Sequence, residues 1–159
     1  MENAVTTRTS ELIQAVYKNV KMAGDSILNL MPHVKDEKLK SDMTVQLSAF
    51  EAFASRAAKL LADEGVKPET EGTLTKLSAK WGTLMNTMRD SPTSHLAEMM
   101  IEGATMGANE MLRELREAEN SNTSESALRL ARDVCTFEEK IVKDKSGEDV
   151  LLTSTGTKF

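Results

Sequence analysis

The spacing of apolar residues along this 159-residue chain restricts its fold more than any other feature. In five separate segments, apolar side chains recur at alternating steps of three and four, which places them on one face of an α-helix. The chain therefore predicts an all-α fold. The first of these stripes comprises Ile13, Val16, Val20, Ala23, Ile27 and Leu30.

Residues that begin and end helices divide the chain between these stripes. Pro32 ends the first helix, because the residue before a proline is pushed out of the α region. Asp36 is a natural N-cap for the second helix, and Gly65 lies where a left-handed residue closes a helix. Asn122, with Glu125 three residues on, resembles a capping box. The predicted helices are residues 10–31, 37–63, 73–89, 92–119 and 123–145.

The helix lengths predict how the helices are connected. Four of them have about 22–28 residues, or roughly 33–42 Å at the rise of an α-helix. Short loops join them into two antiparallel hairpins, and segment 64–91 with its short helix links the hairpins. We predict an antiparallel four-helix bundle with this segment as a long crossover; a plain up-and-down bundle of five helices is the alternative. The bundle domain is then 10–145, with an N-terminal extension 1–9 and a flexible tail 146–159.

Charge and composition restrict the function. The net charge is −5, and no run of Lys or Arg forms the basic face that nucleic acid binding requires. No apolar run approaches the roughly 18 residues that span a bilayer, and the N-terminus has no signal-peptide pattern. A single cysteine, Cys135, excludes an internal disulfide framework. The sequence thus predicts a cytoplasmic protein that binds neither nucleic acid nor membrane.

The core has to be built mainly from aliphatic residues, since aromatic residues are only 4% of the chain. We interpret the ten methionines as core filler, because Met adapts to irregular gaps. A lipid-binding or peptide-binding groove lined by Met is an alternative. Gly103 and Gly107 have the GxxxG spacing, which indicates tight internal packing or room for Trp81. The predicted helices 92–119 and 123–145 run antiparallel on either side of the loop at 120–123, so Glu138 should lie near the level of Thr105.

The order of features in the middle of the chain carries a family resemblance. This region contains, in this order, a Gly-Thr-Leu start, Trp81, a break and a long Glu-rich helix. In this layout, over residues 10–145, the chain resembles the small ferritin-like bundle proteins of bacteria. In metal-binding members of that family, two helices each give one Glu and two give Glu-x-x-His to a di-iron centre. His33 and His95 are the only histidines and neither follows a Glu by three residues, so no complete di-iron ligand set is predicted.

Four glutamates nevertheless fall on or beside apolar faces. Glu138 and Glu110 lie within their stripes, and Glu51 and Glu102 lie at the edges. A carboxylate in a dry core is costly unless it is hydrogen-bonded, paired or protonated. In one interpretation each reaches a hydroxyl, an Arg or the surface; Glu51, for example, is level with Tyr17. In the other, the four form an oxygen-only site for Mg²⁺, Ca²⁺ or Mn²⁺.

The resulting functional hypothesis is a ferritin-like bundle without a di-iron centre or other cofactor. It predicts a non-catalytic structural or interaction protein, with a homodimer as the expected assembly. The alternative hypothesis is a carboxylate-only protein that binds a divalent metal ion through Glu51, Glu102, Glu110 and Glu138.

Overall fold

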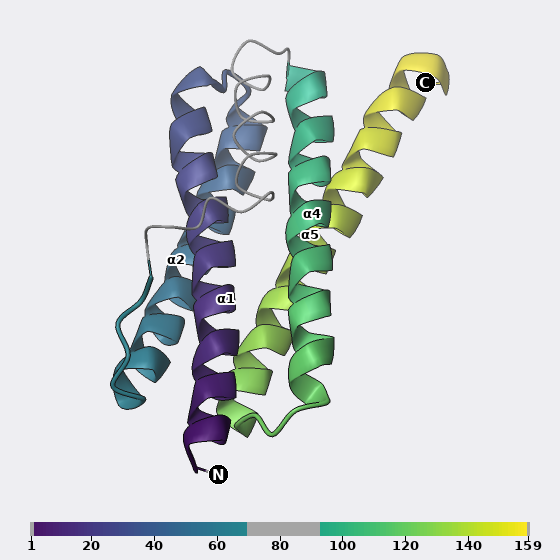
Figure 1. Ribbon diagram of the computed structural model, residues 1–159. Helices are drawn as coiled ribbons and strands as arrows, with labels where there is room; N and C mark the ends of the chain where they lie inside the picture. The colour runs from purple at the N-terminus through teal and green to yellow at the C-terminus, as the bar shows by residue number, and fades with distance from the viewer. Residues whose placement is uncertain (1, 70–92, 159) are drawn as a thin grey trace.

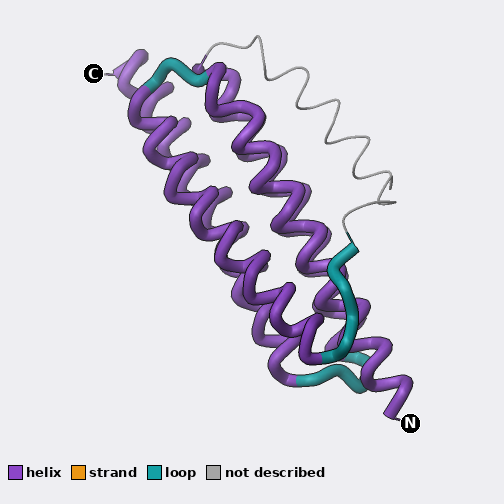
Figure 2. The backbone as a smooth tube through the Cα atoms, turned by 90° about the vertical axis from the view of Figure 1, so that its left-hand side faces the viewer, coloured by secondary structure: helices purple, strands orange, loops and turns teal. Residues whose placement is uncertain are grey.

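Four α-helices and one short 3-10 turn form the part of the chain that the structure describes. The computed structural model describes residues 2–69 and 93–158, with side-chain burial for 8–69 and 95–144. These residues contain no strand, so the predicted all-α fold is confirmed (Figure 2). The predicted helix 73–89 lies outside the described residues. The elements are α1 (Glu2–Leu30), the turn η1 (Met31–His33), α2 (Glu37–Asp63), α4 (Thr93–Glu119) and α5 (Glu125–Lys158).

The helices pair as two antiparallel hairpins, α1 with α2 and α4 with α5. Figure 1 shows α1 and α5 running in one direction and α2 and α4 in the opposite one. Gly24 of α1 faces Leu47 and Phe50 of α2, and Asn19 of α1 donates to the carbonyl of Gly107 in α4. Helix α1 contacts α2, α4 and α5, and α2 also contacts α5. The four helices therefore enclose one common core.

Both ends of α2 agree with the sequence prediction. The Asp36 side chain accepts a hydrogen bond from the Leu39 N–H at 2.8 Å, which satisfies an otherwise unpaired donor of the first turn. At the other end Gly65 has a φ of +73°. The Val66 N–H donates to the Leu61 carbonyl at 2.9 Å, the long bond of a Schellman motif. Local signals thus determine where this helix begins and ends.

Helix α1 begins earlier than the sequence indicates. It starts at Glu2, whereas the sequence predicts a start at residue 10. Thr9 is only 1% exposed, and its Oγ1 accepts a hydrogen bond from the Ser124 N–H at 3.0 Å. This end of α1 is therefore packed against the start of α5, a contact that helix periodicity within α1 does not reveal.

Both ends of α5 also differ from the prediction. Its N-cap is Ser124 and not Asn122, because the Ser124 Oγ accepts a hydrogen bond from the Ala127 N–H at 3.3 Å. The helix continues to Lys158, beyond the predicted end near Lys145. The last residues are rich in Ser, Thr and Gly, which weakens helix propensity and removes the apolar stripe on which the prediction relied. Figure 1 shows this part of α5 diverging from α4.

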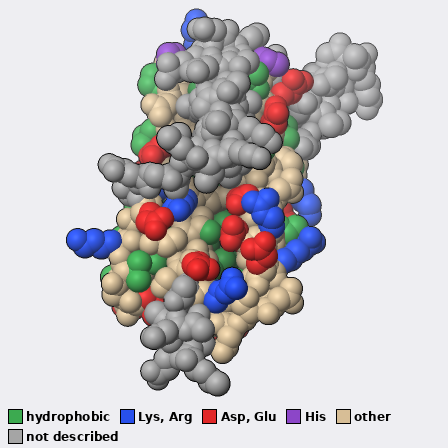
Figure 3. All heavy atoms as spheres, in the orientation of Figure 1, with side chains coloured by type: hydrophobic (Ala, Val, Ile, Leu, Met, Phe, Trp, Pro, Cys, Tyr) green, Lys and Arg blue, Asp and Glu red, His purple; other side chains and the backbone are tan. Residues whose placement is uncertain are grey.

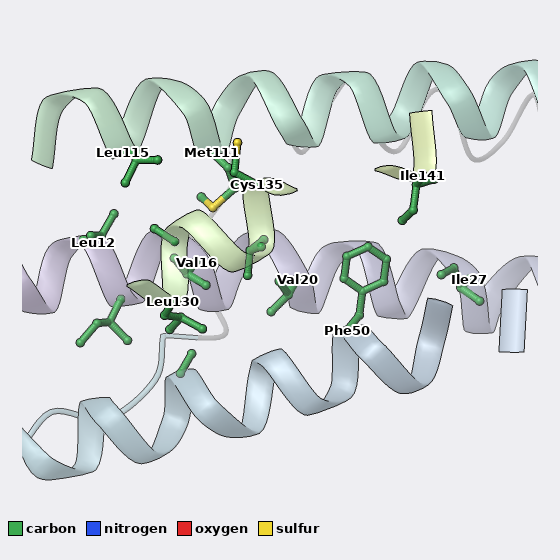
Figure 4. Packing of buried hydrophobic residues seen from close by; sticks show 14 of the residues in the cluster. Leu12, Val16, Val20, Ile27, Phe50, Met111, Leu115, Leu130, Cys135 and Ile141 are labelled. Atoms are coloured by element: carbon green, nitrogen blue, oxygen red, sulfur yellow. The ribbon is translucent and has the colours of Figure 1, made fainter. Parts of the chain in front are cut away.

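The core consists of side chains from all four helices. Figure 4 shows Val16 and Val20 of α1, Phe50 of α2 and Ile141 of α5 in the same interior. Burying each large side chain contributes about 1.5–3 kcal/mol. Met43 and Met111 are completely buried, which confirms core packing as the role of these two methionines. The largest fully buried apolar side chains are Ile13, Met43, Leu61, Met111, Leu130, Val16, Val20 and Val134.

Candidate functional site

Among the side chains that the structure describes, one carboxyl group lies inside the bundle, on the face of α5 where the sequence predicts it. Glu138 is 2% exposed, and burial raises its pKa from 4.5 to about 8. Its Oε1 atom finds no hydrogen-bond partner among the described residues. A charged carboxylate would be costly in this position, because it is removed from water without a compensating partner. The neutral acid is therefore the form that this environment favours at neutral pH.

Two residues from other helices border this carboxyl group. A Cβ atom placed on Gly107 of α4 would lie 2.5 Å from the Glu138 Oε2 and 3.8 Å from the Asn19 Nδ2. Gly107 therefore leaves the space that the carboxyl group occupies. Asn19 of α1 is 8% exposed; its Nδ2 donates to the Gly107 carbonyl at 3.1 Å. Its Oδ1 finds no partner among the described residues.

The sequence points to two members of this group and misses the third. The sequence predicts that Glu138 lies near the level of Thr105 on α4, and in the structure it lies against Gly107. The offset of about two residues is small at a rise of about 1.5 Å per residue. Gly107 serves the tight packing predicted from the GxxxG spacing, with the Glu138 carboxyl group against it. Asn19 was missed. Its position beside the stripe of Val16 and Val20 was the one indication in the sequence that it could face the core, but polar residues at such positions are usually solvated.

Glu110 lies on the rim of the bundle and not in its interior. Its side chain is 22% exposed and forms an ion pair with Arg113, one turn further along α4. Burial and the neighbouring Glu110 and Glu117 carboxylates raise the pKa of Glu114 on the same face. Figure 3 shows acidic and basic side chains interspersed on the visible face of the molecule. This part of α4 is thus a charged surface, as the structural interpretation of Glu110 predicts.

Glu51 and Glu102 are both exposed. Glu51 lines the same surface groove as Tyr17, which agrees with the predicted level of these two residues. Within residues 2–69 and 93–158, no three His, Cys, Asp or Glu side chains are grouped as a metal site would require. Glu51, Glu102, Glu110 and Glu138 are therefore not brought together, and the carboxylate-only metal site stays a hypothesis.

Neither histidine faces the core. His33 is exposed in the turn η1, and His95 is exposed near the start of α4, where it lies 3.4 Å from Glu98. Cys135 is 5% exposed, and its thiol lies 3.6 Å from the Glu139 carboxylate. Burial and Glu139 raise the pKa of this thiol to about 11. The thiol is thus protonated at neutral pH, when a nucleophile would need the thiolate.

A groove of about 330 Å³ runs between α1 and α2. Its floor is apolar, with Val20, Leu47 and Phe50 among the lining residues. Leu28 lies at its margin and is 52% exposed, which is unusual for a residue of this size in the described chain. Since Val20 and Phe50 are buried, Leu28 and the partly buried Leu47 are the apolar side chains that this groove offers for contact with another molecule.

Comparison of the chain with protein-family models, with curated proteins and with solved structures finds no match. Among the described helices, none is both long enough and apolar enough to cross a membrane.

Proposed function

We propose that this chain is a ferritin-like four-helix bundle without a di-iron centre, which acts as a non-catalytic structural or interaction protein. The surroundings of Glu138 are the observation that carries the proposal. In the Glu-x-x-His motif of the metal-binding members, a histidine follows the glutamate by three residues. Here that position is Ile141, which is 7% exposed and belongs to the hydrophobic core.

The contacts between helices support the ferritin-like layout. Helix α1 packs directly against α4, and α2 packs against α5. Through these contacts the four described helices pack directly against one another around one core. In such an arrangement the segment between α2 and α4 acts as a crossover outside the core, whereas a five-helix up-and-down bundle would insert it between them.

Metal analysis tests the absence of a di-iron centre. The full chain is purified without chelator, its metal content is measured, and Fe²⁺ is then added in air. We expect iron well below one equivalent and no oxo-bridge absorption band. Stoichiometric iron together with such a band, both lost in Glu138→Ala, would refute the proposal. Binding of Mn²⁺ or Mg²⁺ that Glu138→Ala abolishes would instead favour the carboxylate-only metal protein.

The proposed assembly is a homodimer, with the α1–α2 groove as its contact. An apolar surface that is exposed in one copy is removed from water when two copies meet, which favours association. Leu28→Asp should shift the protein toward monomer in sedimentation velocity, since it puts a charge at the margin of the groove. Val45→Asp is the matched control, because Val45 is 66% exposed on α2 and does not line the groove. Monomeric wild-type protein at high concentration would contradict the dimer.

A further inference from the structure

Two buried oxygen atoms near the middle of the bundle need a hydrogen-bond donor. They are the Oε1 of Glu138 and the Oδ1 of Asn19, and neither has a partner among the described residues. Both side chains are more than nine-tenths buried. A buried acceptor without a donor costs about 1–3 kcal/mol, and more if it is charged. The two side chains that carry these atoms both lie against Gly107 of α4, through the Glu138 Oε2 and the Asn19 Nδ2, which makes this a site whose protonation state matters.

We propose that Glu138 remains a neutral carboxylic acid in the folded bundle, donates its proton toward Asn19, and loosens the packing of α5 against α1 and α4 when it loses that proton. A protonated carboxyl group has one O–H donor, whereas a carboxylate has only acceptors. Protonation therefore gives the Glu138 carboxyl group an O–H donor, and the Asn19 Oδ1 on the neighbouring side chain is a buried acceptor that lacks a donor among the described residues. Glu138 thus acts as a pH-sensitive link between three helices.

Gly107 makes this arrangement sterically feasible. Asn19 is held against α4 by its bond to the Gly107 carbonyl, and the Glu138 carboxyl group lies in the space above the same glycine. Both side chains thus converge on one point of α4 from α1 and α5. Any side chain at position 107 would compete with the carboxyl group for this space. The burial that follows also excludes the water that would stabilise a carboxylate.

The charged groups around this layer do not neutralise a Glu138 carboxylate. Burial is the cause of the raised pKa of Glu138. The thiol of Cys135, one turn earlier on α5, has its own pKa raised partly by the Glu138 charge. Among the described residues, the other charged groups near this level of the bundle are exposed or engaged elsewhere: Glu139 on α5, Glu110 with Arg113 on α4, Lys18 with Glu69 on α1 and after α2, and Glu51 on α2.

The sign of the pH dependence follows from the direction of the pKa shift. Below about pH 4.5 the acid is neutral in both the folded and the unfolded chain, so it does not alter stability with pH. Between pH 4.5 and about 8 only the unfolded chain releases the proton, which favours unfolding. The unfolding equilibrium constant should then rise about tenfold per pH unit from this group. Above that range both states are ionised and the effect levels off.

Comparison of wild type with Glu138→Gln tests this link. The Gln amide has nearly the shape of the acid and supplies a donor at every pH, so it mimics the protonated form. Urea unfolding of the full chain is measured from pH 4 to 9. We expect the ratio of the two unfolding constants to grow about tenfold per pH unit between pH 4.5 and about 8 and then to level off, with Glu138→Gln the more stable. Glu139→Gln, at the adjacent exposed position, should run parallel to wild type.

Infrared spectroscopy of the wild-type protein provides a measurement that does not depend on any variant folding. A protonated carboxyl group has a C=O stretch that is separate from the bands of a carboxylate. We expect one such band at pH 6 to 7, where exposed carboxyl groups are ionised, and its loss above pH 8. Absence of the band at pH 6, or parallel pH profiles of wild type and Glu138→Gln, would overturn the proposal. Stabilisation by Mn²⁺ or Mg²⁺ that requires Glu138 would overturn it as well.

Discussion

Helix α1 meets the α4–α5 hairpin through two buried polar side chains, and the two contacts are built differently. Near the N-terminal end, Thr9 accepts a hydrogen bond from the backbone of Ser124 at 3.0 Å. Near the middle, Asn19 donates to the backbone of Gly107 but leaves its Oδ1 without a partner among the described residues, beside the buried Glu138. The first contact contains only neutral groups. The second contains an acid.

This difference shows how a buried polar contact depends on the chemistry of its members. A hydroxyl and a backbone amide keep their protons at every pH between 4 and 9, so the contact at Thr9 is constant. The contact at Asn19 is complete only while Glu138 is protonated. One end of the same helix interface is therefore fixed, whereas its middle responds to pH. The predictions that follow separate the two contacts.

The largest effect should come from a second acid in the middle contact. Asn19→Asp places a carboxyl group beside Glu138, where burial opposes charge and two carboxyl groups repel each other. We expect a loss of about 3–5 kcal/mol in unfolding free energy near pH 7, falling toward pH 4, as both acids become neutral. Urea unfolding at several pH values measures it.

Asn29→Asp is the control for this substitution. Asn29 is also on α1, and its amide also donates to a backbone carbonyl, that of Asp25 at 2.9 Å, but it is exposed. The control should change stability by no more than about 0.5 kcal/mol. Equal losses in the two variants would remove the distinction between the middle contact and the surface.

The next largest effect should come from the contact at the end of α1. Thr9→Val keeps the shape of the side chain but removes the acceptor for the Ser124 N–H, which should cost about 1–3 kcal/mol. The loss should be the same at pH 5 and pH 8, unlike that of Asn19→Asp. Thr44→Val, at an exposed threonine of α2, should cost no more than about 0.5 kcal/mol. A pH-dependent loss in Thr9→Val would show that the two contacts are coupled.

A smaller effect is expected from Gly107→Ala. The added Cβ lies 2.5 Å from the Glu138 Oε2, and crowding of this kind typically costs about 1–3 kcal/mol. Better helix propensity returns up to about 1 kcal/mol, so a modest net loss should appear in thermal unfolding. Gly24→Ala is the control, because its Cβ would meet Leu47 and Phe50 at ordinary distances of 3.7 and 3.8 Å. We expect Gly24→Ala to gain stability and Gly107→Ala to lose it.

The smallest effect concerns an ion pair on the surface. Arg56 of α2 and Asp133 of α5 approach to 2.7 Å, but their side chains are 39% and 47% exposed. Arg56→Ala should therefore cost about 0–1 kcal/mol, and less in high salt. A larger loss in unfolding experiments, independent of salt, would show that this surface contact rivals the buried ones.

The predicted burial was right for the glutamate in the middle of a stripe, whereas positions at the edges of stripes were less informative. Glu138 is at the centre of its apolar face, and it is buried as predicted. Glu51 and Glu102 lie at the edges of their stripes, and both are exposed. Each step along a helix turns the side chain by about 100°, so the apolar pattern does not decide on which side of the boundary an edge residue lies. Asn19 could not be recognised, because its role arises from Gly107 and Glu138, far away in the sequence.

The sequence by itself determined the all-α fold and the full extent of α2, because the apolar spacing, the Asp36 cap and the Gly65 turn act within a few residues. It also determined that Glu138 faces the core. Only the tertiary structure decided that α1 begins at Glu2 and that Ser124, whose N–H donates to Thr9, starts α5. It likewise decided which glutamates meet water and which one needs a proton, since that depends on side chains that distant helices bring to the same place.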